Sequence, residues 1–468
     1  MAAYLLFEVM VMLLSRLYDV VWSPWLLGLF LAAGLYYSLR TGFFQIFRIP
    51  LWLRTTFGAM LRRRGRGNGR GISQFQALAT ALASTIGTGS IAGVATAIWF
   101  GGPGAVFWMW VAALLGMMTG CAEKLLSVRY RRAGPAGWLG GPMYYIRDGL
   151  KSPLLAGWFA LACLPATLTG GDMVQSSSIA AALQATFGWD RLAVGAAVAV
   201  LTGLVMVGGI GRIARVSSGL VPAMALLYLG GGAAVLAARA DQIPEAMALI
   251  FCSALRPEAA VGGGMGYTLA AALRYGVARG VFTNEAGLGT SAMAHAAAEV
   301  DCPARQGMWG IVEVCVSTLL VCTATALVIL VSGVYGPADA LVRGALGAVP
   351  PDRLGAPLTA AAFSSVLGPW GGAVVSLSLL LFAFSSILGW SWYGEQSILY
   401  LTGSRRLVPA YRLVFLSCVV LGSVWEGEAV WELVDLCNAL MAIPNLTALL
   451  LLSPQVLREL RDWERTGG

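Results

Sequence analysis

The sequence predicts an all-α polytopic membrane protein with about eleven transmembrane helices. Hydrophobic residues make up 58% of the 468 residues and only 12% are charged, and the mean hydropathy is +0.75. This composition excludes an ordinary soluble protein, and one large membrane domain is expected to account for nearly the whole chain. The segments that predict the helices are 22–44, 73–100, 105–128, 154–187, 192–209, 219–238, 244–275, 306–333, 361–401, 408–424 and 430–452.

The distribution of charge predicts how these segments are oriented. The net charge of +8 comes mostly from Arg, and the basic residues gather in alternate loops and in the tail, at 48–70, 129–151, 212–215, 274–305, 405–406 and 458–465. Cytoplasmic loops carry an excess of Lys and Arg. We therefore expect the N-terminus outside and the C-terminus in the cytoplasm, in a plasma membrane such as the bacterial inner membrane. The first twenty residues show no basic leader or cleavage site, and residues 4–14 fit either an interfacial helix or a marginal extra span.

The second segment is interrupted near its centre. Within residues 83–94, ASTIGTGSIAGV, Gly87 and Gly89 flank Thr88, and glycine lowers the cost of leaving helical geometry. A helix that breaks there frees carbonyl groups, which attract a cation, and N–H groups, which attract an anion. Such a pair suits sodium beside a carboxylate, as in the discontinuous helices of secondary transporters. The alternative reading is close helix packing by small residues.

A second glycine-rich interruption is expected in the seventh segment, at residues 259–266, AAVGGGMG. The two interrupted segments are five apart, so they would each begin a five-helix unit. Because five is odd, the two units must insert with opposite orientations, which is the inverted-repeat plan of many sodium-coupled carriers. The expected organisation is an N-terminal helix and basic loop (1–72), two repeats (73–241 and 242–453) and a cytoplasmic tail (454–468).

Polar residues at mid-depth in the bilayer are costly and call for partners. Asp172 and Gln175 lie one turn apart in the fourth segment, followed by three serines. Serine often bonds back to its own helix, whereas an isolated ionised carboxylate at that depth should be paired, protonated or wetted. Asp172 is therefore a candidate functional residue.

Two further segments carry polar groups. Ser385 and Ser386 lie at the centre of the ninth segment, where two hydroxyls would complete the oxygen shell of a sodium ion, and Trp390 would form a wall for a small apolar side chain or simply pack between helices. The eighth segment carries Glu313 and Ser317, and the position of Glu313 near the cytoplasmic end favours solvation of its carboxylate.

Several classes of function lack support in the sequence. His295 is the sole histidine and is interpreted as structural, and the eight cysteines are scattered without metal-ligand spacing. No phosphate-binding loop is present, so an ion gradient rather than ATP is the expected source of energy. No nucleophile–base pair indicates an enzyme, and no module indicates nucleic-acid binding or an organic cofactor.

Five stretches together resemble the alanine or glycine:cation symporter family, sodium-coupled amino-acid carriers with the leucine-transporter fold. They are 86–97 (IGTGSIAGVATA), 101–110 (GGPGAVFWMW), 140–146 (GGPMYYI), 276–287 (GVARGVFTNEAG) and 387–395 (ILGWSWYGE). They follow one another over most of the chain, which makes the set much more specific than any one motif.

The resemblance implies roles for particular residues. Amides around Thr88 and Gly89 would meet the substrate carboxylate, and Gln175 and Trp390 would help to form the pocket. The break near residues 262–266, represented by Gly263, would close the site from the other side. Sodium would lie among the carbonyls of Ala83 and Ile86 and the hydroxyls of Ser385 and Ser386, with Ser386 and Asp172 also near the substrate. The sequence departs from the family pattern at Ser90, Asp172, Ser177 and Ser317.

The expected function is sodium-coupled symport of a small neutral amino acid, alanine or glycine, into the cell by alternating access. A proton-coupled or altered-substrate carrier that uses Asp172 is the alternative of the same class. A membrane receptor or scaffold that keeps the fold without transport is the alternative of another class. The expected partners are the amino acid, the coupling ion and membrane lipid, and the sequence leaves the oligomeric state open.

Overall fold

The computed structural model describes residues 24–58, 71–134, 137–255, 269–335, 355–425 and 428–466. The elements of the N-terminal half are α2 (Pro24–Arg40), α3 (Phe44–Phe47), α4 (Ile49–Leu53), the π-helical η1 (Arg54–Gly58), α6 (Gln74–Thr85), the π-helical η2 (Gly89–Gly93), α7 (Val94–Gly101), α8 (Gly104–Arg129), strands β1 (Arg132–Gly134) and β2 (Gly137–Leu139), α9 (Pro142–Gly149), α10 (Pro153–Leu168), the π-helical η3 (Thr169–Met173), α11 (Val174–Phe187), α12 (Arg191–Met206) and α13 (Gly209–Ala238).

The C-terminal half continues in the same way. Its elements are the 3₁₀ turn η4 (Ala240–Gln242), α14 (Ile243–Leu255), α15 (Leu269–Asn284), α16 (Ala292–Ala296), α17 (Pro303–Val314), the π-helical η5 (Cys315–Cys322), α18 (Thr323–Val331), α20 (Ala356–Leu367), α21 (Pro369–Thr402), the 3₁₀ turn η7 (Arg405–Leu407), α22 (Val408–Val424), α23 (Glu428–Leu451) and α24 (Ser453–Arg465). Within the described residues the one sheet is the antiparallel pair β1–β2.

The helices are long and apolar enough to form a membrane domain, as the composition predicts. Seven helical stretches pass as membrane spans, or eight if the bent pair α6 and α7 forms one, counted over the described residues. Shorter apolar helices include α2, α12 and α20. The number eleven stays a prediction.

The predicted interruption of the second segment is confirmed. Helix α6 begins with a capping box, in which Ser73 and Gln76 each bond the other's backbone N–H. It ends at Thr85, and the axis bends by 54° before the chain continues as η2 and α7. The bend falls at the Gly87–Gly89 stretch, where the sequence places it.

A second buried break lies between α15 and α16, at residues 285–291, and the sequence prediction missed it. The predicted break at 259–266, with Gly263, lies outside the described residues. The expected end of the segment at Tyr275 is wrong, because α15 runs on to Asn284. Residues 283–298, expected in a stretch on the cytoplasmic side, are all buried, and the side they face stays a prediction. Positive φ angles of 54° at Glu285, 98° at Gly287 and 81° at Gly289 turn the chain here.

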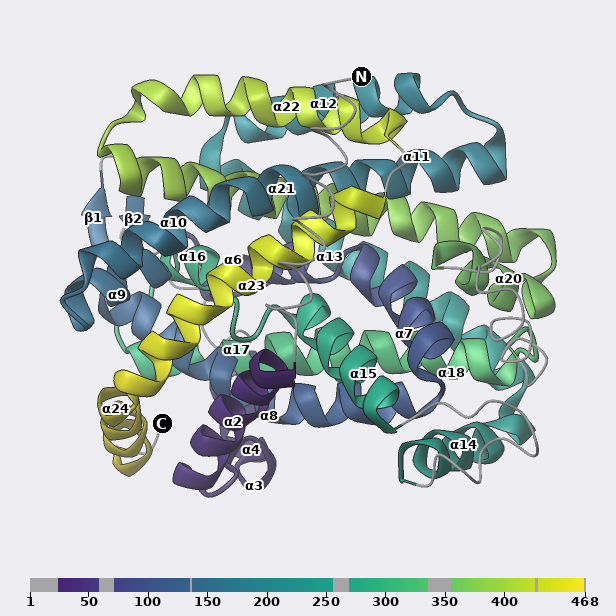
Figure 1. The fold of residues 1–468 in the computed structure, drawn as a ribbon, viewed down its shortest axis with the longest axis horizontal. Coiled ribbons are helices and arrows are strands. Elements are labelled where there is room, and N and C mark those ends of the chain that lie inside the picture. Colours follow the sequence, from purple (N-terminus) through teal and green to yellow (C-terminus); the bar gives the residue numbers. More distant parts are fainter. Residues whose placement is uncertain are drawn as a thin grey trace, which may run out of the picture.

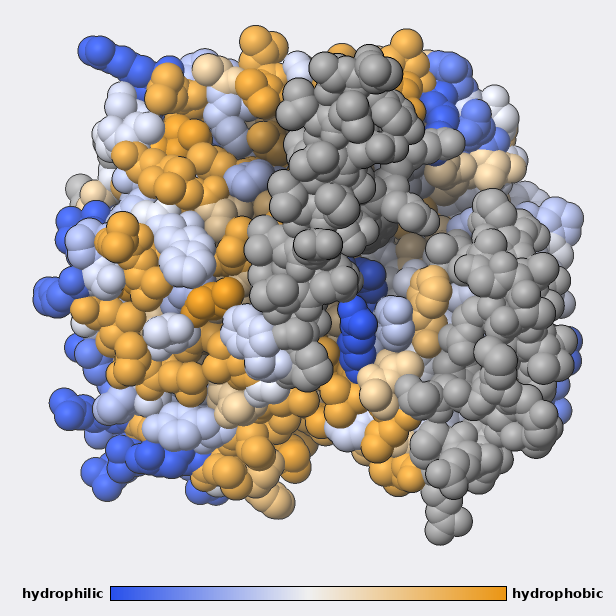
Figure 2. All heavy atoms as spheres, in the orientation of Figure 1, coloured by the Kyte–Doolittle hydropathy of each residue, from blue (hydrophilic) through white to orange (hydrophobic). Residues whose placement is uncertain are grey.

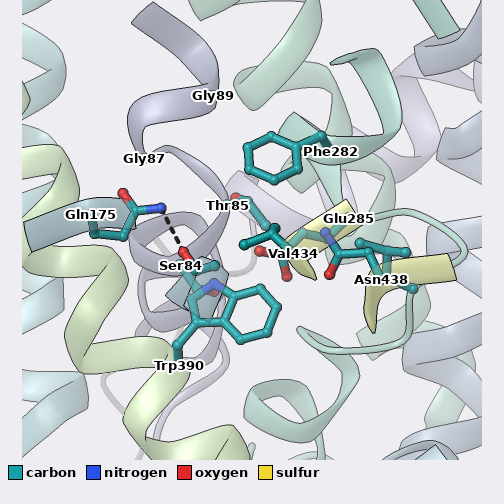
Figure 3. A pocket seen from close by; sticks show the side chains of 12 residues that line it. Ser84, Thr85, Gly87, Gly89, Gln175, Phe282, Glu285, Trp390, Val434 and Asn438 are labelled. Carbon is teal, nitrogen blue, oxygen red and sulfur yellow. Dashed lines mark hydrogen bonds between the residues drawn. The ribbon is translucent and has the colours of Figure 1, made fainter. Parts of the chain in front are cut away.

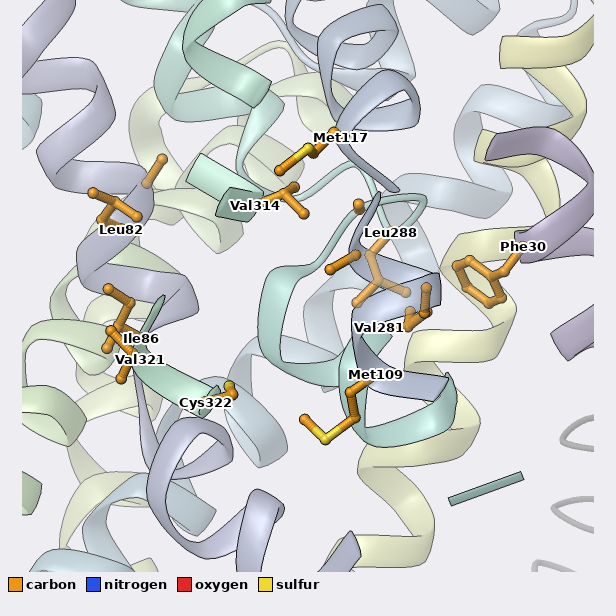
Figure 4. Packing of buried hydrophobic residues seen from close by; sticks show 14 of the residues in the cluster. Phe30, Leu82, Ile86, Met109, Met117, Val281, Leu288, Val314, Val321 and Cys322 are labelled. Atoms are coloured by element: carbon orange, nitrogen blue, oxygen red, sulfur yellow. The ribbon is translucent and has the colours of Figure 1, made fainter. Parts of the chain in front are cut away.

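The core is built around α8, which packs against α2, α15 and α17, while α10 and η3 pack against α21 and α23, and α11 packs against α21 (Figure 1). Helices α12 and α22 lie side by side along one edge of the molecule. Met109, Met117, Val281 and Val314 are among the buried residues that join α8 to α15 and α17 (Figure 4). The contact is close because a Cβ on Gly310 would lie 2.5 Å from the backbone oxygen of Gly120.

The surface separates into an apolar body and polar ends. Leu154, Leu226 and Trp370 are among the large apolar side chains that are more than three-quarters exposed, and in Figure 2 apolar residues cover most of the visible described face. Hydrophilic side chains gather over β1, β2, α9 and α24 at the left of that view. Helix α24 buries Leu460 and Trp463, and its Glu464 pairs with Arg48 at 2.8 Å.

Candidate functional site

A small enclosed cavity lies between the two helix breaks, lined by residues from α6, η3, α11, α15, α21 and α23 (Figure 3). The space open to the centre of a water molecule is about 20 Å³, which is enough for roughly one water. Its lining residues are Ser84, Thr85, Gly87, Gly89, Gly170, Gln175, Phe282, Glu285, Leu288, Trp390, Val434 and Asn438.

The first break supplies backbone groups on one side of the cavity. The N–H of Thr88 donates to Oε1 of Gln175 at 3.3 Å, and Nε2 of Gln175 donates to the carbonyl of Gly170 at 3.0 Å. A bound carboxylate would compete with Gln175 for the Thr88 amide, because both offer an oxygen acceptor. A Cβ on Gly89 would lie 3.0 Å from the Phe282 ring and 3.1 Å from Oγ1 of Thr283, so glycine allows the two breaks to meet.

Aromatic rings form the apolar walls. Trp390 is 6% exposed and meets Tyr393 edge-on, with ring centroids 5.6 Å apart. A Cβ on Gly171 would collide with Trp390, so η3 lies directly against the indole. Phe282 lies across the cavity from Trp390 (Figure 3). The rings of Trp390 and Phe282 form part of the apolar lining of the cavity.

The second break contributes a carboxylate. Glu285 lines the cavity while being only 3% exposed, and Oγ1 of Thr290 donates a hydrogen bond to it. Asn438 lies beside Glu285, opposite Gln175 (Figure 3). Its Oδ1 is buried without a partner among the described residues. The cavity therefore has amide donors at one end and acceptors at the other.

Side chains of other helices hold the second break together. Oε1 of Glu123 accepts from the N–H of Gly287 at 2.8 Å and from Nδ2 of Asn445 at 2.7 Å, and Nδ2 also donates to the carbonyl of Gly287 at 2.8 Å. Asn284 donates to Thr318 and accepts from the N–H of Ala286. Irregular backbone is thus satisfied by protein groups, as burial at membrane depth requires.

Oxygen atoms gather where α21 meets the end of α6. Oγ of Ser385 donates to the carbonyl of Ala83 at 2.9 Å and that of Phe382 at 2.8 Å, and Oγ of Ser386 donates to the carbonyls of Ala83 and Ser84 at 3.1 Å each. A set of hydroxyl and carbonyl oxygens is the chemistry that a hard cation such as sodium prefers. Ile86 caps the C-terminal end of α6 close by.

Asp172 lies away from the cavity. It is fully buried in η3, neither carboxylate oxygen has a partner among the described residues, and it is absent from the cavity lining. Tyr411 and Cys418 on α22 interact electrostatically with Asp172, and η3 packs directly on α22. Asp172 therefore lies in the part of η3 that packs against α22.

The sequence-predicted residues divide as follows. Gly89, Gln175 and Trp390 line the cavity, Thr88 bonds to Gln175, and Ser386 lies behind the cavity, since a Cβ on Gly87 would be 2.5 Å from its Oγ. The sequence prediction missed Phe282, Glu285, Val434 and Asn438. Glu285 stood inside one of the family-like stretches, and Asn438 is a polar residue within the eleventh apolar segment, but no spacing pattern connected them to the site.

A second group of charges lies next to this site, fully buried. Nζ of Lys124 is 3.3 Å from carboxylate oxygens of both Glu123 and Glu313. Nε2 of His295 lies 3.1 Å from Glu313, and Nδ1 lies 2.6 Å from the amide nitrogen of Gln306. The expectation that solvent covers Glu313 is wrong: its side chain is 0% exposed because Lys124 and His295 enclose it.

Comparison with known proteins gives a consistent result. The sequence profile of the sodium:alanine symporter family matches residues 7–467. An uncharacterized transporter of Haemophilus influenzae is 42% identical over 96% of this chain and 95% of its own length. The sodium/alanine symporter AgcS of Methanococcus maripaludis is 41% identical over 96% of each chain. A probable sodium/glutamine symporter, GlnT of Bacillus subtilis, is 36% identical over 96% of this chain and 89% of its own.

The fold is also similar to a solved transporter. A mutant form of the manganese transporter of Eremococcus coleocola superposes with a TM-score of 0.52 at 17% identity, over 81% of this chain and 79% of that one. This likeness concerns the arrangement of the helices and carries no information on the cargo.

Proposed function

Since the chain belongs to the sodium:alanine symporter family and is therefore an integral membrane protein of a transporter family, we propose that it carries a small neutral amino acid into the cell with sodium. Alanine or glycine is the proposed substrate, and alternating access is the proposed mechanism. The observation that carries this proposal is the cavity between the two breaks, with backbone amides at one end and acceptor oxygens at the other.

The groups that line the cavity match the charged ends of an amino-acid zwitterion, and the side chains around its one-water space must move apart to admit the substrate. The substrate carboxylate takes the amides near Thr88 and Gly89 when Gln175 moves aside, because helix N-terminal N–H groups bind anions. The side chain lies between Trp390 and Phe282. The close packing of Gly171 on Trp390 favours alanine or glycine over a longer side chain such as that of glutamine.

Sodium is proposed to bind beside the substrate, at the meeting of α6 and α21. The carbonyls of Ala83 and Ile86 and the hydroxyls of Ser385 and Ser386 are the proposed ligands. The hydrogen bonds from both hydroxyls to Ala83 support this assignment, since the same oxygens lie within reach of one ion. Sodium bound there would draw α6 and α21 together and organise the neighbouring amides.

The proposed architecture is a 5+5 inverted repeat preceded by one helix, with repeats at 73–241 and 242–453. Support comes from the two broken elements, α6–α7 and α15–α16, which meet at Gly89 and Phe282. The proposed orientation places the N-terminus outside and the 454–468 tail in the cytoplasm. Basic residues in α24 and near β1 agree with a cytoplasmic face at that end.

A proton-coupled carrier is a second candidate, because Asp172 is a buried carboxyl without a partner among the described residues. In that case Asp172 would carry a proton through the cycle in place of, or beside, sodium.

Uptake of labelled alanine into proteoliposomes tests the proposal. Accumulation that requires an inward sodium gradient is the expected result. Accumulation with a pH gradient alone would favour the carrier that uses Asp172. Absence of alanine uptake under either gradient would overturn the proposal and favour another substrate or a non-transporting receptor.

A further inference from the structure

Glu285 is a carboxylate inside the cavity with no ion pair among the described residues. It lies in the second break with φ of 54°, a left-handed backbone conformation that is uncommon for residues other than glycine and that often occurs at functional sites. Thr290 on the same loop donates to it, and the unpartnered Oδ1 of Asn438 faces the same cavity from α23. The two residues supply acceptors where the amino group of a bound zwitterion would lie.

The charges around Glu285 do not balance its own. Glu285 interacts electrostatically with Glu123 and Lys124 on α8 and with Glu313 on α17. Tyr393 on α21 and Cys163 on α10 also interact electrostatically with Glu285, and both side chains are neutral at ordinary pH. Lys124 is already shared between Glu123 and Glu313 at 3.3 Å from each. An ionised Glu285 would add a third carboxylate to a buried region that holds one lysine, at a large desolvation cost.

We propose that Glu285 is the counter-charge of the substrate ammonium group, and that in the empty cavity it holds a proton which substrate binding releases. This inference rests on the proposed function. The substrate arrives as a zwitterion and keeps its ammonium protons, while the O–H bond of the Glu285 carboxyl breaks. The proton leaves to water when the cavity opens to solvent to admit the substrate, and the carboxylate then pairs with the ammonium group. The ammonium charge thus replaces the proton as the partner of the carboxylate.

Such an exchange makes alanine and a proton competitors. At a saturating sodium concentration, alanine affinity should rise with pH, by at most about tenfold per pH unit for one released proton. The rise should level off at alkaline pH, where the empty cavity has already lost the proton.

Isothermal titration of the purified protein with alanine, in buffers of different ionisation enthalpy, measures the released protons directly. We expect close to one proton per alanine at mildly acidic pH and fewer as the pH rises. Alanine binding with a heat that is independent of the buffer at every pH would overturn the exchange while leaving the proposed function intact. If sodium-saturated protein binds no alanine at all, the proposed function itself fails.

Two variants assign the proton. Glu285→Gln should bind alanine more weakly, with no proton release and a flat pH dependence. Asp172→Asn is the matched control, because Asp172 is an equally buried carboxyl outside the cavity, and it should release the same proton as the wild type. Loss of release in Asp172→Asn with retention in Glu285→Gln would overturn the assignment.

A third variant covers the case in which Glu285→Gln binds too weakly for calorimetry. Asn438→Asp places a second carboxyl beside Glu285, and neighbouring carboxyls hold a shared proton more tightly. The decline of proton release should then move to higher pH than in the wild type. An unchanged profile in Asn438→Asp would contradict the placement of the released proton on Glu285.

Discussion

The two helix breaks around the cavity differ in how their backbone is satisfied. The first, between Thr85 and Gly89, is made by glycines, and a single side chain, Gln175, takes up the Thr88 amide. The second, at residues 285–291, is held by Glu123 and Asn445 from two other helices. The Thr88 amide of the first break can therefore exchange Gln175 for a ligand, while the hydroxyls of Ser385 and Ser386 hold the carbonyls of Ala83 and Ser84 on its other side. The second is a fixed scaffold that presents Glu285.

This difference predicts that changes at the first break will affect binding and changes at the scaffold of the second will affect stability. The largest effect is expected for Gly87→Ala. The new Cβ would lie 2.5 Å from Oγ of Ser386 and 3.0 Å from Oε1 of Gln175, so it displaces groups of both the sodium and the substrate sites. Alanine uptake should fall to background in proteoliposomes.

The control is Gly93→Ala in the same broken element, where no heavy atom lies within 4 Å of the added Cβ. It should transport at close to the wild-type rate. Normal uptake by Gly87→Ala would show that the first break does not form the site.

The next effect concerns sodium. Ser385→Ala combined with Ser386→Ala removes two proposed oxygen ligands, so half-maximal uptake should need at least about tenfold more sodium, equivalent to about 1.4 kcal/mol. Alanine affinity should fall with it through coupling between the sites. Ser391→Ala is the control, since its hydroxyl bonds within its own helix to Leu388. An unchanged sodium requirement in the double variant would show that Ser385 and Ser386 are not sodium ligands.

At the second break, Asn445→Leu should act mainly on stability. It leaves the Gly287 carbonyl without its donor and removes a hydrogen bond to Glu123, at a cost of about 2–4 kcal/mol. The melting temperature in detergent should drop by several degrees, whereas the remaining folded protein keeps its sodium dependence. Thr447→Val on the same helix is the control. The Thr447 hydroxyl donates only to the carbonyl of Ile443 in its own helix, so this change should alter the melting temperature little. A shifted sodium dependence without loss of stability in Asn445→Leu would contradict the scaffold role.

The sequence predicts the first break and not the second for a physical reason. Gly87 and Gly89 interrupt an apolar run of membrane length, so the signal is local. Residues 285–291 have polar neighbours and basic flanks typical of a loop, and their burial depends on Glu123 and Asn445, more than 150 residues away in either direction. The apolar segments themselves predict the fold class. Gln175, Trp390, Ser385 and Ser386 could be selected as candidates because they lie in the middle of such segments. Glu285 and Asn438 require knowledge of which helices meet.

The smallest effect is expected for Asp172→Asn, and it separates the two candidate coupling ions. Asp172 lies in η3 beside α22, outside the cavity, and its carboxyl has no partner among the described residues. A lone buried carboxyl is most stable in its neutral, protonated form, because ionisation there carries the full desolvation cost. Asparagine matches that neutral form in size and polarity. Alanine affinity in Asp172→Asn should therefore stay within about twofold of the wild type, a difference of about 0.4 kcal/mol, with an equal or slightly higher melting temperature. Uptake should still require the sodium gradient.

The contrary outcome is specific: wild-type uptake driven by a pH gradient without sodium, and lost in Asp172→Asn, would show that Asp172 ionises during the cycle. The η3–α22 interface would then bind and release a proton during the cycle, in addition to the ion exchange at the two breaks.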